Sequence, residues 1–261
     1  MRNRKSTVTP VFYISLAIAF VFILWGVFAP GNVETVLGTI NGFISNELGW
    51  VYLLAMTGFV VFALYLIVSP YGSIRLGKQD EKPQYSYFTW FSFLFTAGMG
   101  VGLVFYGVNE PLTHFHNPPI AEGGTALAQQ EALQYTLFHW GLHPWAVYAV
   151  VGLALAYFNF RHNAPLLMSS ALSPLIGDRS KGWMGTTVDV VAVFGTIFGI
   201  ATSLGLGATQ ITAGLSYSFD AIESNLMTQM IVVIIITIAF IASAATGVNK
   251  GIRYLSMGNV V

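Results

Sequence analysis

The sequence has little charge and no cysteine. Charged residues make up 8% of its 261 positions, hydrophobic residues make up 55%, and the mean hydropathy is +0.67. This composition excludes a large water-soluble core, because it is typical of a chain whose surroundings are mostly lipid. The absence of cysteine excludes disulfides, thiolate metal sites and cysteine nucleophiles. A formal net charge of zero gives no indication of nucleic-acid binding.

Long apolar runs fill most of the chain instead. They cover residues 11–29, 49–69, 88–108, 135–160, 187–210 and 228–247. Each run reaches the roughly 20 residues that a helix needs to cross the hydrocarbon core. The first run follows a basic start, as in a signal peptide, but it is longer and has no clear small-residue cleavage site. We therefore predict an all-α polytopic membrane protein that retains its first span.

Lysine and arginine are missing from alternate gaps between these runs. They lie only before the first run, between the second and third, between the fourth and fifth, and after the sixth: Arg2, Arg4, Lys5, Arg75, Lys78, Lys82, Arg161, Arg179, Lys181, Lys250 and Arg253. The other gaps carry Glu34 and Glu47, then Glu110, Glu122 and Glu131, then Asp220 and Glu223. Under the positive-inside rule the basic gaps face the cytoplasm. The N-terminus is therefore predicted to be cytoplasmic.

The connections between runs are short, and we expect no separate soluble domain. The longest connection, residues 112–134, contains Pro118 and Pro119 and an alanine-rich stretch at 126–133. We expect that stretch to form an external amphipathic helix. Residues 249–256 have the pattern of a cytoplasmic turn before a further span. We therefore expect this chain to be the front part of a longer protein.

The third run contains glycines at alternate positions. Its sequence at 97–111 is AGMGVGLVFYGVNEP, with Gly98, Gly100 and Gly102. These three glycines cannot share one helix face, and each costs a helix interior about 1 kcal/mol relative to alanine. One interpretation is backbone that leaves the helix and offers carbonyl oxygens to a cation or main chain to a substrate. The other is close helix packing, and the spacing leaves both open.

The fourth run concentrates aromatic residues around a proline. Its sequence at 138–148 is FHWGLHPWAVY. On a helix, Trp140, Trp145 and Tyr148 fall within about 140° of arc. Pro144 removes the hydrogen bond to the carbonyl of Trp140 and predicts a kink between the two tryptophans. Convergent aromatic faces suit a quaternary ammonium ion, while an interfacial aromatic belt is the alternative.

Together these segments resemble the betaine/carnitine/choline transporter family. The likeness is carried by YGVNEP at 106–111, HWGLHPWAVYAVVGLALAY at 139–157, VFGTIFGIATSLGLG at 193–207 and GVNKGIRYLS at 247–256. The resemblance implies a LeuT-like fold with two peripheral spans followed by two inverted repeats. Residues 1–261 would then be one incomplete transmembrane domain: a cytoplasmic segment at 1–10, the peripheral spans at 11–69, and a first repeat at 88–261 truncated at the start of a seventh span.

The same resemblance implies a substrate site. It assigns half of an aromatic box to Trp140, Trp145 and Tyr148, and the other half would lie beyond Val261. The glycine stretch would border the substrate through Gly98, Met99, Gly100 and Gly102. The substrate class would be glycine betaine, choline, carnitine or a related quaternary ammonium compound.

Sodium coupling is also implied by the resemblance, with no other cofactor. At a first site the ion would meet the backbone carbonyls of Thr96 and Met99, and a second sodium site would use the hydroxyl of Thr196. Ile200 stands where the family has a second threonine, and it offers no side-chain oxygen. Ser203, about 20° away from Thr196 around a helix, is a substitute ligand. Tight packing of small residues is the alternative explanation for this stripe.

Other titratable residues are interpreted as structural. His139 and His143 have the spacing of metal ligands but lack a third ligand nearby. Asp189 and Glu110 lie near span ends, where capping or hydrated carboxylates are ordinary, and proton coupling is the alternative. No phosphate loop, catalytic triad or metalloprotease motif is present, so an enzyme is not expected.

These observations predict a secondary transporter that imports a quaternary ammonium osmolyte across the plasma membrane, coupled to sodium. Proton coupling and substrate exchange are alternatives, and an ion channel or an inactive truncated fragment are alternatives of another class. The resemblance suggests a homotrimer in contact with membrane lipid.

Overall fold

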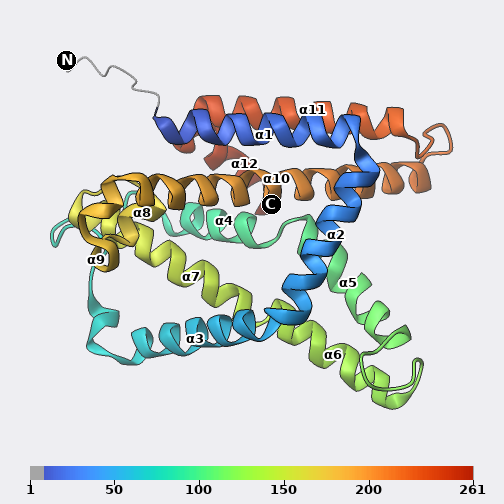
Figure 1. Ribbon diagram of the computed structural model, residues 1–261, viewed down its shortest axis with the longest axis horizontal. Helices are drawn as coiled ribbons and strands as arrows, with labels where there is room; N and C mark the ends of the chain where they lie inside the picture. The colour runs from blue at the N-terminus through green and yellow to red at the C-terminus, as the bar shows by residue number, and fades with distance from the viewer. Residues whose placement is uncertain (1–8, 261) are drawn as a thin grey trace. The chain divides into compact units, whose positions relative to one another are not determined.

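The computed structural model describes residues 9–260, and within that range it is mostly helical with no strand (Figure 1). The predicted cytoplasmic segment at 1–10, with Arg2, Arg4 and Lys5, lies outside the described residues except for its last two positions. The α-helices are α1 Pro10–Phe28, α2 Pro30–Glu47, α3 Gly49–Val68, α4 Tyr87–Gly98, α5 Val101–His116, α6 Ala126–Trp140, α7 Leu142–Ala156, α8 Met168–Ala171, α9 Ser173–Ile176, α10 Trp183–Ser218, α11 Leu226–Thr246 and α12 Arg253–Val260. Short 3-10 helices are η1 Pro70–Ser73 and η3 Gly177–Lys181, and short π-helices are η2 Tyr157–Arg161 and η4 Val248–Ile252.

Five stretches of helix are long and apolar enough to cross a membrane. They are Pro10–Phe28, Gly49–Val68, Ala126–Arg161, Trp183–Ser218 and Leu226–Thr246, and α4 with α5 makes a sixth if the bent pair is one span. The prediction of an all-α polytopic membrane protein is confirmed.

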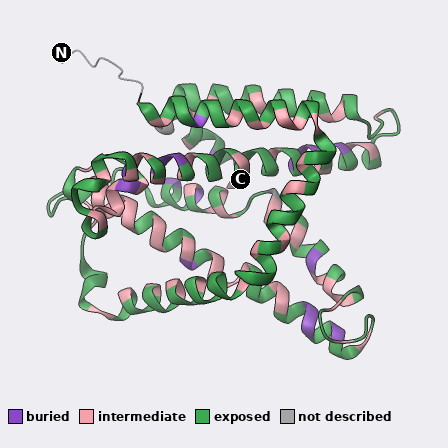
Figure 2. Cartoon of the chain, in the orientation of Figure 1, coloured by how far each residue is buried: buried purple, intermediate pink, exposed green. Residues whose placement is uncertain are grey.

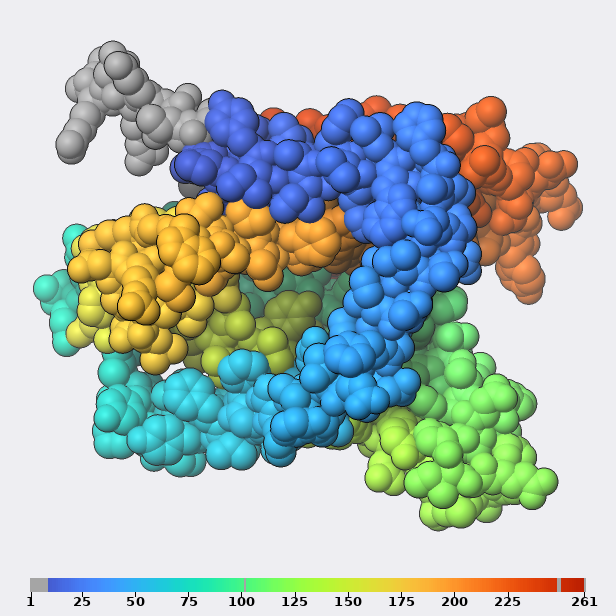
Figure 3. Space-filling model, viewed as in Figure 1, coloured from blue at the N-terminus to red at the C-terminus, as the bar shows by residue number. Residues whose placement is uncertain are grey.

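Bulky apolar side chains cover the outside of these helices. Phe20 on α1, Leu54 on α3 and Ile235 on α11 are all exposed, and Figure 2 colours most of these three helices as exposed. In Figure 3 the side chains of α1 and α3 stand on the visible surface. Such a surface is unfavourable in water and suits lipid or further protein.

The first gap between apolar runs is a helix, although we expected a loop there. Helix α2 begins with Pro30, which is tolerated because the first helical residue needs no N–H partner. The hydroxyls of Thr35 and Thr39 donate to the carbonyls of Gly31 and Thr35, four residues earlier. The glutamates Glu34 and Glu47 therefore lie on a helix and not in an extended connection.

The expected external helix at 126–133 is present but is not separate. It forms the first half of α6, which continues to Trp140. Helix α10 is also longer than its apolar run at 187–210, since it contains 36 residues and measures about 54 Å at 1.5 Å per residue.

The chain divides into two compact units. Unit 1 is Met1–Glu81 with Phe138–Ile197, and unit 2 is Lys82–Leu137 with Phe198–Val261. In unit 1, α3 packs against α7, and in unit 2, α4 packs against α12. The aromatic segment around Trp145 belongs to unit 1, and the glycine segment around Gly100 belongs to unit 2.

Candidate functional site

The glycine stretch of unit 2 interrupts a helix. Helix α4 ends at Gly98, Met99 has φ −93° and ψ 61°, and Gly100 is extended at φ −89° and ψ −179° before α5 begins. The two helices are bent by 45°. The predicted break is confirmed and is confined to Met99 and Gly100, because Gly98 and Gly102 remain helical.

The break exposes main-chain groups. The N–H of Met99 still donates to the carbonyl of Phe95 at 2.7 Å, but the helix ends there. The carbonyls that follow in this last turn, including that of Thr96, lose the partners that a continuing helix would supply. No heavy atom lies within 4 Å of the place where a Cβ would sit on Gly100. The backbone is therefore open to a ligand at this point.

A short helix supports the end of α4. The hydroxyl of Thr96 donates to the carbonyl of Ser256 at 3.5 Å, and the amide of Asn259 donates to the Thr96 hydroxyl at 3.5 Å. Thr89 and Ser92, on the same side of α4, are fully buried. Sequence reasoning missed this contact with α12. The polar residues at 89, 92 and 96 share one helix face, which is the signal that could have revealed it.

The aromatic segment of unit 1 also contains a break. Helix α6 ends at Trp140, Gly141 has φ −86° and ψ −136°, and α7 begins at Leu142. The helix is therefore interrupted between the two tryptophans, at Gly141, within the single membrane-length stretch Ala126–Arg161. Pro144 is the third residue of α7, where its missing N–H costs little because first-turn N–H groups lack helical partners.

The structure brings two of the three predicted box residues together. The rings of Trp145 and Tyr148 have centroids 5.8 Å apart, and both side chains are exposed. The indole N–H of Trp145 donates to the carbonyl oxygen of Trp140 at 3.1 Å. The ring of Trp140 lies against that of His139, 5.1 Å away. The 140° arc assumed one continuous helix, and the break at Gly141 removes that assumption.

The predicted sodium-binding side chains lie on α10. The hydroxyl of Thr196 donates to the carbonyl of Ala192 at 2.8 Å, which leaves its oxygen lone pairs to accept from or coordinate another group. Ile200 supplies no oxygen, and Ser203 also lies on α10. Carbonyl and hydroxyl oxygens are the donors that hard cations prefer, so the Thr96 and Met99 carbonyls on the one hand, and the Thr196 hydroxyl on the other, each have suitable chemistry.

The two histidines of the fourth run have separate surroundings. Nε2 of His143 lies 3.3 Å from the hydroxyl of Thr57 on α3, and its ring lies 4.5 Å from that of Phe138. His139 instead contacts Trp140. Within residues 9–260 no group of three or more His, Asp or Glu side chains could hold a metal ion.

Three buried carboxylates are engaged in local contacts. Asp189 accepts from the N–H of Ser169 at 2.9 Å and from its hydroxyl at 2.7 Å. Glu131 accepts from the N–H groups of Ile120 and Ala121 at 3.3 and 3.2 Å. Asp189 thus binds the first turn of α8, and Glu131 binds the connection between α5 and α6.

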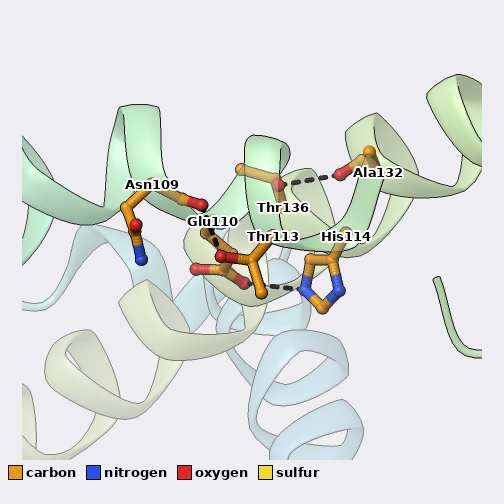
Figure 4. Close-up of polar contacts among 6 residues, drawn as sticks. All are labelled: Asn109, Glu110, Thr113, His114, Ala132 and Thr136. Carbon is orange, nitrogen blue, oxygen red and sulfur yellow. Dashed lines mark hydrogen bonds and ion pairs between the residues drawn. The ribbon is translucent and has the colours of Figure 1, made fainter. Parts of the chain in front are cut away.

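The third carboxylate, Glu110, pairs with His114 one turn later on α5, at 3.5 Å. Figure 4 shows this pair beside Thr113, whose hydroxyl donates to the carbonyl of Asn109, and near the bond from Thr136 to Ala132 on α6. The ring of His114 also lies 5.5 Å from that of Tyr135 on α6. The pair therefore lies where α5 meets α6.

Comparison with known proteins gives a consistent result. The family described as betaine/carnitine/choline family transporter (BCCT) matches residues 10–261. The glycine betaine transporter OpuD of Bacillus subtilis is 49% identical over 97% of this chain and 50% of its own length. A probable glycine betaine transporter of Desulfitobacterium hafniense is 47% identical over 96% of this chain and 50% of its own. The osmo-dependent choline transporter BetT2 of Acinetobacter baylyi is 42% identical over 96% of this chain and 36% of its own. The chain spans half or less of the length of these relatives.

Proposed function

The chain belongs to the betaine/carnitine/choline transporter family, and from this membership we propose that the protein imports glycine betaine or a related quaternary ammonium osmolyte. Transport would be secondary, driven by sodium entering with the substrate, and would proceed by alternating access around the broken α4–α5 and α6–α7 segments. The relatives named as glycine betaine transporters support this substrate class.

The observation that carries the proposal is the pair formed by Trp145 and Tyr148. Their rings lie 5.8 Å apart and both remain exposed, so a cation can approach their faces. A quaternary ammonium group donates no hydrogen bond, and cation–π attraction of about 2 kcal/mol per desolvated contact is the interaction left to hold it. Trp140 would complete this half of the aromatic box after a change in its side-chain position.

The glycine break would serve substrate and ion together. Gly98, Met99, Gly100 and Gly102 would let the substrate approach the main chain, as interrupted spans do in other transporter folds. The carbonyls of Thr96 and Met99 would coordinate one sodium ion, and the hydroxyl of Thr196 would contribute to a second sodium site. Ile200 stands where the family has a threonine and offers no side-chain oxygen, so it would weaken sodium binding at the second site, beside Thr196.

The remaining parts of the proposal concern placement. The distribution of lysine and arginine supports a cytoplasmic N-terminus in the plasma membrane. The exposed apolar surface of the helices supports contact with lipid and with further protein, and we propose a homotrimer.

Choline is the second candidate substrate. It carries the same trimethylammonium head as glycine betaine and differs at the other end of the molecule. The likeness to a relative named as an osmo-dependent choline transporter favours it specifically.

Uptake measurements test the proposal. The natural reading frame that contains these residues, and the 261-residue chain alone, would each be expressed in cells that lack betaine and choline transporters. Radiolabelled glycine betaine and choline would be supplied with sodium or with potassium. We expect saturable uptake of glycine betaine that requires sodium.

Three outcomes would change the proposal. Equal uptake in potassium would remove sodium coupling and favour protons or exchange. Preferential uptake of choline would replace the substrate. A substrate-independent ionic current without saturable uptake would indicate a channel.

A further inference from the structure

The helices α3 and α7 each contain a single hydrogen-bonding side chain other than their aromatic residues. In α3, GWVYLLAMTGFVVFALYLIV, it is Thr57, and in α7, LHPWAVYAVVGLALA, it is His143. The two helices pack together in unit 1, and these two side chains meet, with Oγ1 of Thr57 3.3 Å from Nε2 of His143. Apart from tryptophan and tyrosine, the only hydrogen-bonding side chains of these two helices therefore contact each other.

The contact differs from what most helical threonines in this chain do, although Thr96 also reaches another helix. The hydroxyls of Thr39, Thr136 and Thr196 each donate to the carbonyl four residues earlier in their own helix. The hydroxyl of Thr57 instead lies against another helix. Gly58 follows Thr57 and has no side chain. No heavy atom lies within 4 Å of the position that its Cβ would occupy, so there is open space beside α3 at this point. A side chain from α7 can reach the hydroxyl without displacing a neighbour.

The surroundings make the contact worth more than it would be in water. Helix α3 has a mean hydropathy of 2.4, and Thr57 lies about 12 Å along it from Gly49 at 1.5 Å per residue. A position halfway along a membrane span lies near the middle of the hydrocarbon core, where lipid chains offer the Thr57 hydroxyl no competing hydrogen bond. Either neutral tautomer of His143 can make the bond, because Nε2 accepts in one and donates in the other.

His143 lies at the point where α7 has the least support from its own backbone. Helix α6 has ended at Trp140, Gly141 is not helical, and Pro144 has no N–H to contribute. The ring of Phe138 packs against His143 at 4.5 Å, and Trp145 donates to the carbonyl of Trp140. The first turn of α7 is thus held by side chains, and the contact of His143 joins it to α3.

We propose that Thr57 and His143 are positioning residues that set the first turn of α7 and so hold the rings of Trp145 and Tyr148 in place for the substrate. The link to substrate depends on the proposed transport function, whereas the effect on the order of α7 does not. Helix α3 then helps to position the aromatic site through Thr57, in addition to facing lipid.

The test uses a spin label and uptake in the same set of variants. Residues 1–261 contain no cysteine, so one cysteine introduced at Ala149, next to Tyr148, is the only nitroxide site within them. Thr57→Val removes the hydroxyl at nearly constant volume, and Thr57→Ser keeps it. Thr39→Val is the matched control, since Thr39 bonds only within α2 among the contacts recorded for it. His143→Gln, in the natural Thr57 background, replaces the ring nitrogen with an amide that can still bond.

We expect Thr57→Val to make the nitroxide more mobile and to raise the KM for glycine betaine about threefold to tenfold, the range given by hydrogen bonds between membrane helices. The maximal uptake rate, corrected for the amount of protein in the membrane, should change less than twofold. Thr57→Ser, His143→Gln and Thr39→Val should resemble the natural protein in both measurements.

Two results would overturn the inference. Unchanged mobility in Thr57→Val would show that the contact does not order α7, whatever the protein transports. Greater mobility with an unchanged KM would show that the contact acts on stability alone. Absence of uptake in the natural protein would contradict the proposed function, and the nitroxide spectra would still decide whether Thr57 orders α7. If Thr57→Val does not reach the membrane, His143→Leu removes the same hydrogen bond from the α7 side, and the same two measurements apply to it.

Discussion

The indole N–H of Trp145 donates a hydrogen bond to the carbonyl oxygen of Trp140, 3.1 Å away, across the start of α7. In a continuous helix that carbonyl would accept from residue 144, but residue 144 is proline and has no N–H. The side chain of Trp145 therefore provides the donor that the backbone lacks. The same bond fixes the indole ring beside Tyr148. One residue thus closes the break in the helix and forms part of the proposed substrate site.

Replacing Trp145 by phenylalanine separates these two roles. Phenylalanine keeps an aromatic face but removes the N–H that donates to the Trp140 carbonyl, and a hydrogen bond of this kind contributes about 0.5–1.5 kcal/mol. We expect Trp145→Phe to raise the KM for glycine betaine about threefold to tenfold and to lower the melting temperature of the purified protein. Trp183→Phe, at an exposed position that begins α10, is the control and should change neither. Equal behaviour of the two variants would remove the role assigned to the indole N–H.

Gly100 offers a second test, because adding a methyl group there should not disturb the fold. Its φ of −89° is available to every residue, and no heavy atom lies within 4 Å of the new Cβ. We expect Gly100→Ala to reach the membrane in normal amounts but to lose most of its uptake, since the methyl group would occupy the space needed by a ligand against the backbone.

Gly107→Ala is the matched control for that variant. Gly107 lies inside α5 and also has no heavy atom within 4 Å of a new Cβ, and alanine favours a helix interior by about 1 kcal/mol. We expect it to transport normally. If Gly100→Ala also transports normally, the main chain at the break does not contact the substrate or the ion.

Much of this architecture could be predicted from hydropathy and from glycine and proline. The spans at 11–29 and 49–69 coincide closely with α1 and α3, and the breaks near Gly100 and Gly141 were expected. Helix α10 was predicted too short because its last turns, residues 211–218, contain threonine, glycine and serine and so end the apolar run without ending the helix. Hydropathy reports the solvent around a segment and not the hydrogen bonds within it.

The contacts of the site could be predicted less well than its segments. Periodicity places Thr57 and His143 in apolar helices, but it does not say that α3 and α7 pack together. The support of Thr96 by Ser256 and Asn259 likewise joins residues about 160 positions apart in the chain. Such pairs depend on tertiary packing, which one sequence does not encode in any local pattern. The arc that placed Trp140 with Trp145 was unreliable for a related reason, since the helix that would define it stops at Trp140.

Ile200 provides a prediction about the coupling ion. A threonine there would stand four residues after Thr196 on α10, so the two hydroxyls would share one helix face. We expect Ile200→Thr to lower the sodium concentration that gives half-maximal uptake by about twofold to fivefold. Ile200→Val, which changes the shape without adding oxygen, is the control. A sodium dependence that is unaltered by Ile200→Thr would indicate that no ion binds at this turn.

The last prediction concerns Asp189, whose buried carboxylate is proposed to be a structural cap and not a proton carrier. It accepts from both the N–H and the hydroxyl of Ser169, the second residue of α8. Removing it in Asp189→Ala leaves the N–H of Ser169 without this acceptor, which costs about 1–3 kcal/mol. We expect the melting temperature to fall by about 5 °C. Asp178→Ala is the control, since Asp178 is fully exposed and its ion pair with Lys181 contributes little.

A second measurement on the same residue distinguishes the cap from proton coupling. A structural cap predicts that uptake per folded molecule responds to sodium and to the proton gradient in Asp189→Ala as it does in the natural protein, because the carboxylate takes no part in transport. Ser169→Ala removes only the hydroxyl donor, so it should be less destabilising than Asp189→Ala, and the double variant should add little to the effect of Asp189→Ala alone. If Asp189→Ala instead folds normally and loses only a response to the proton gradient, then its carboxylate carries the coupled proton, and sodium is not the coupling ion.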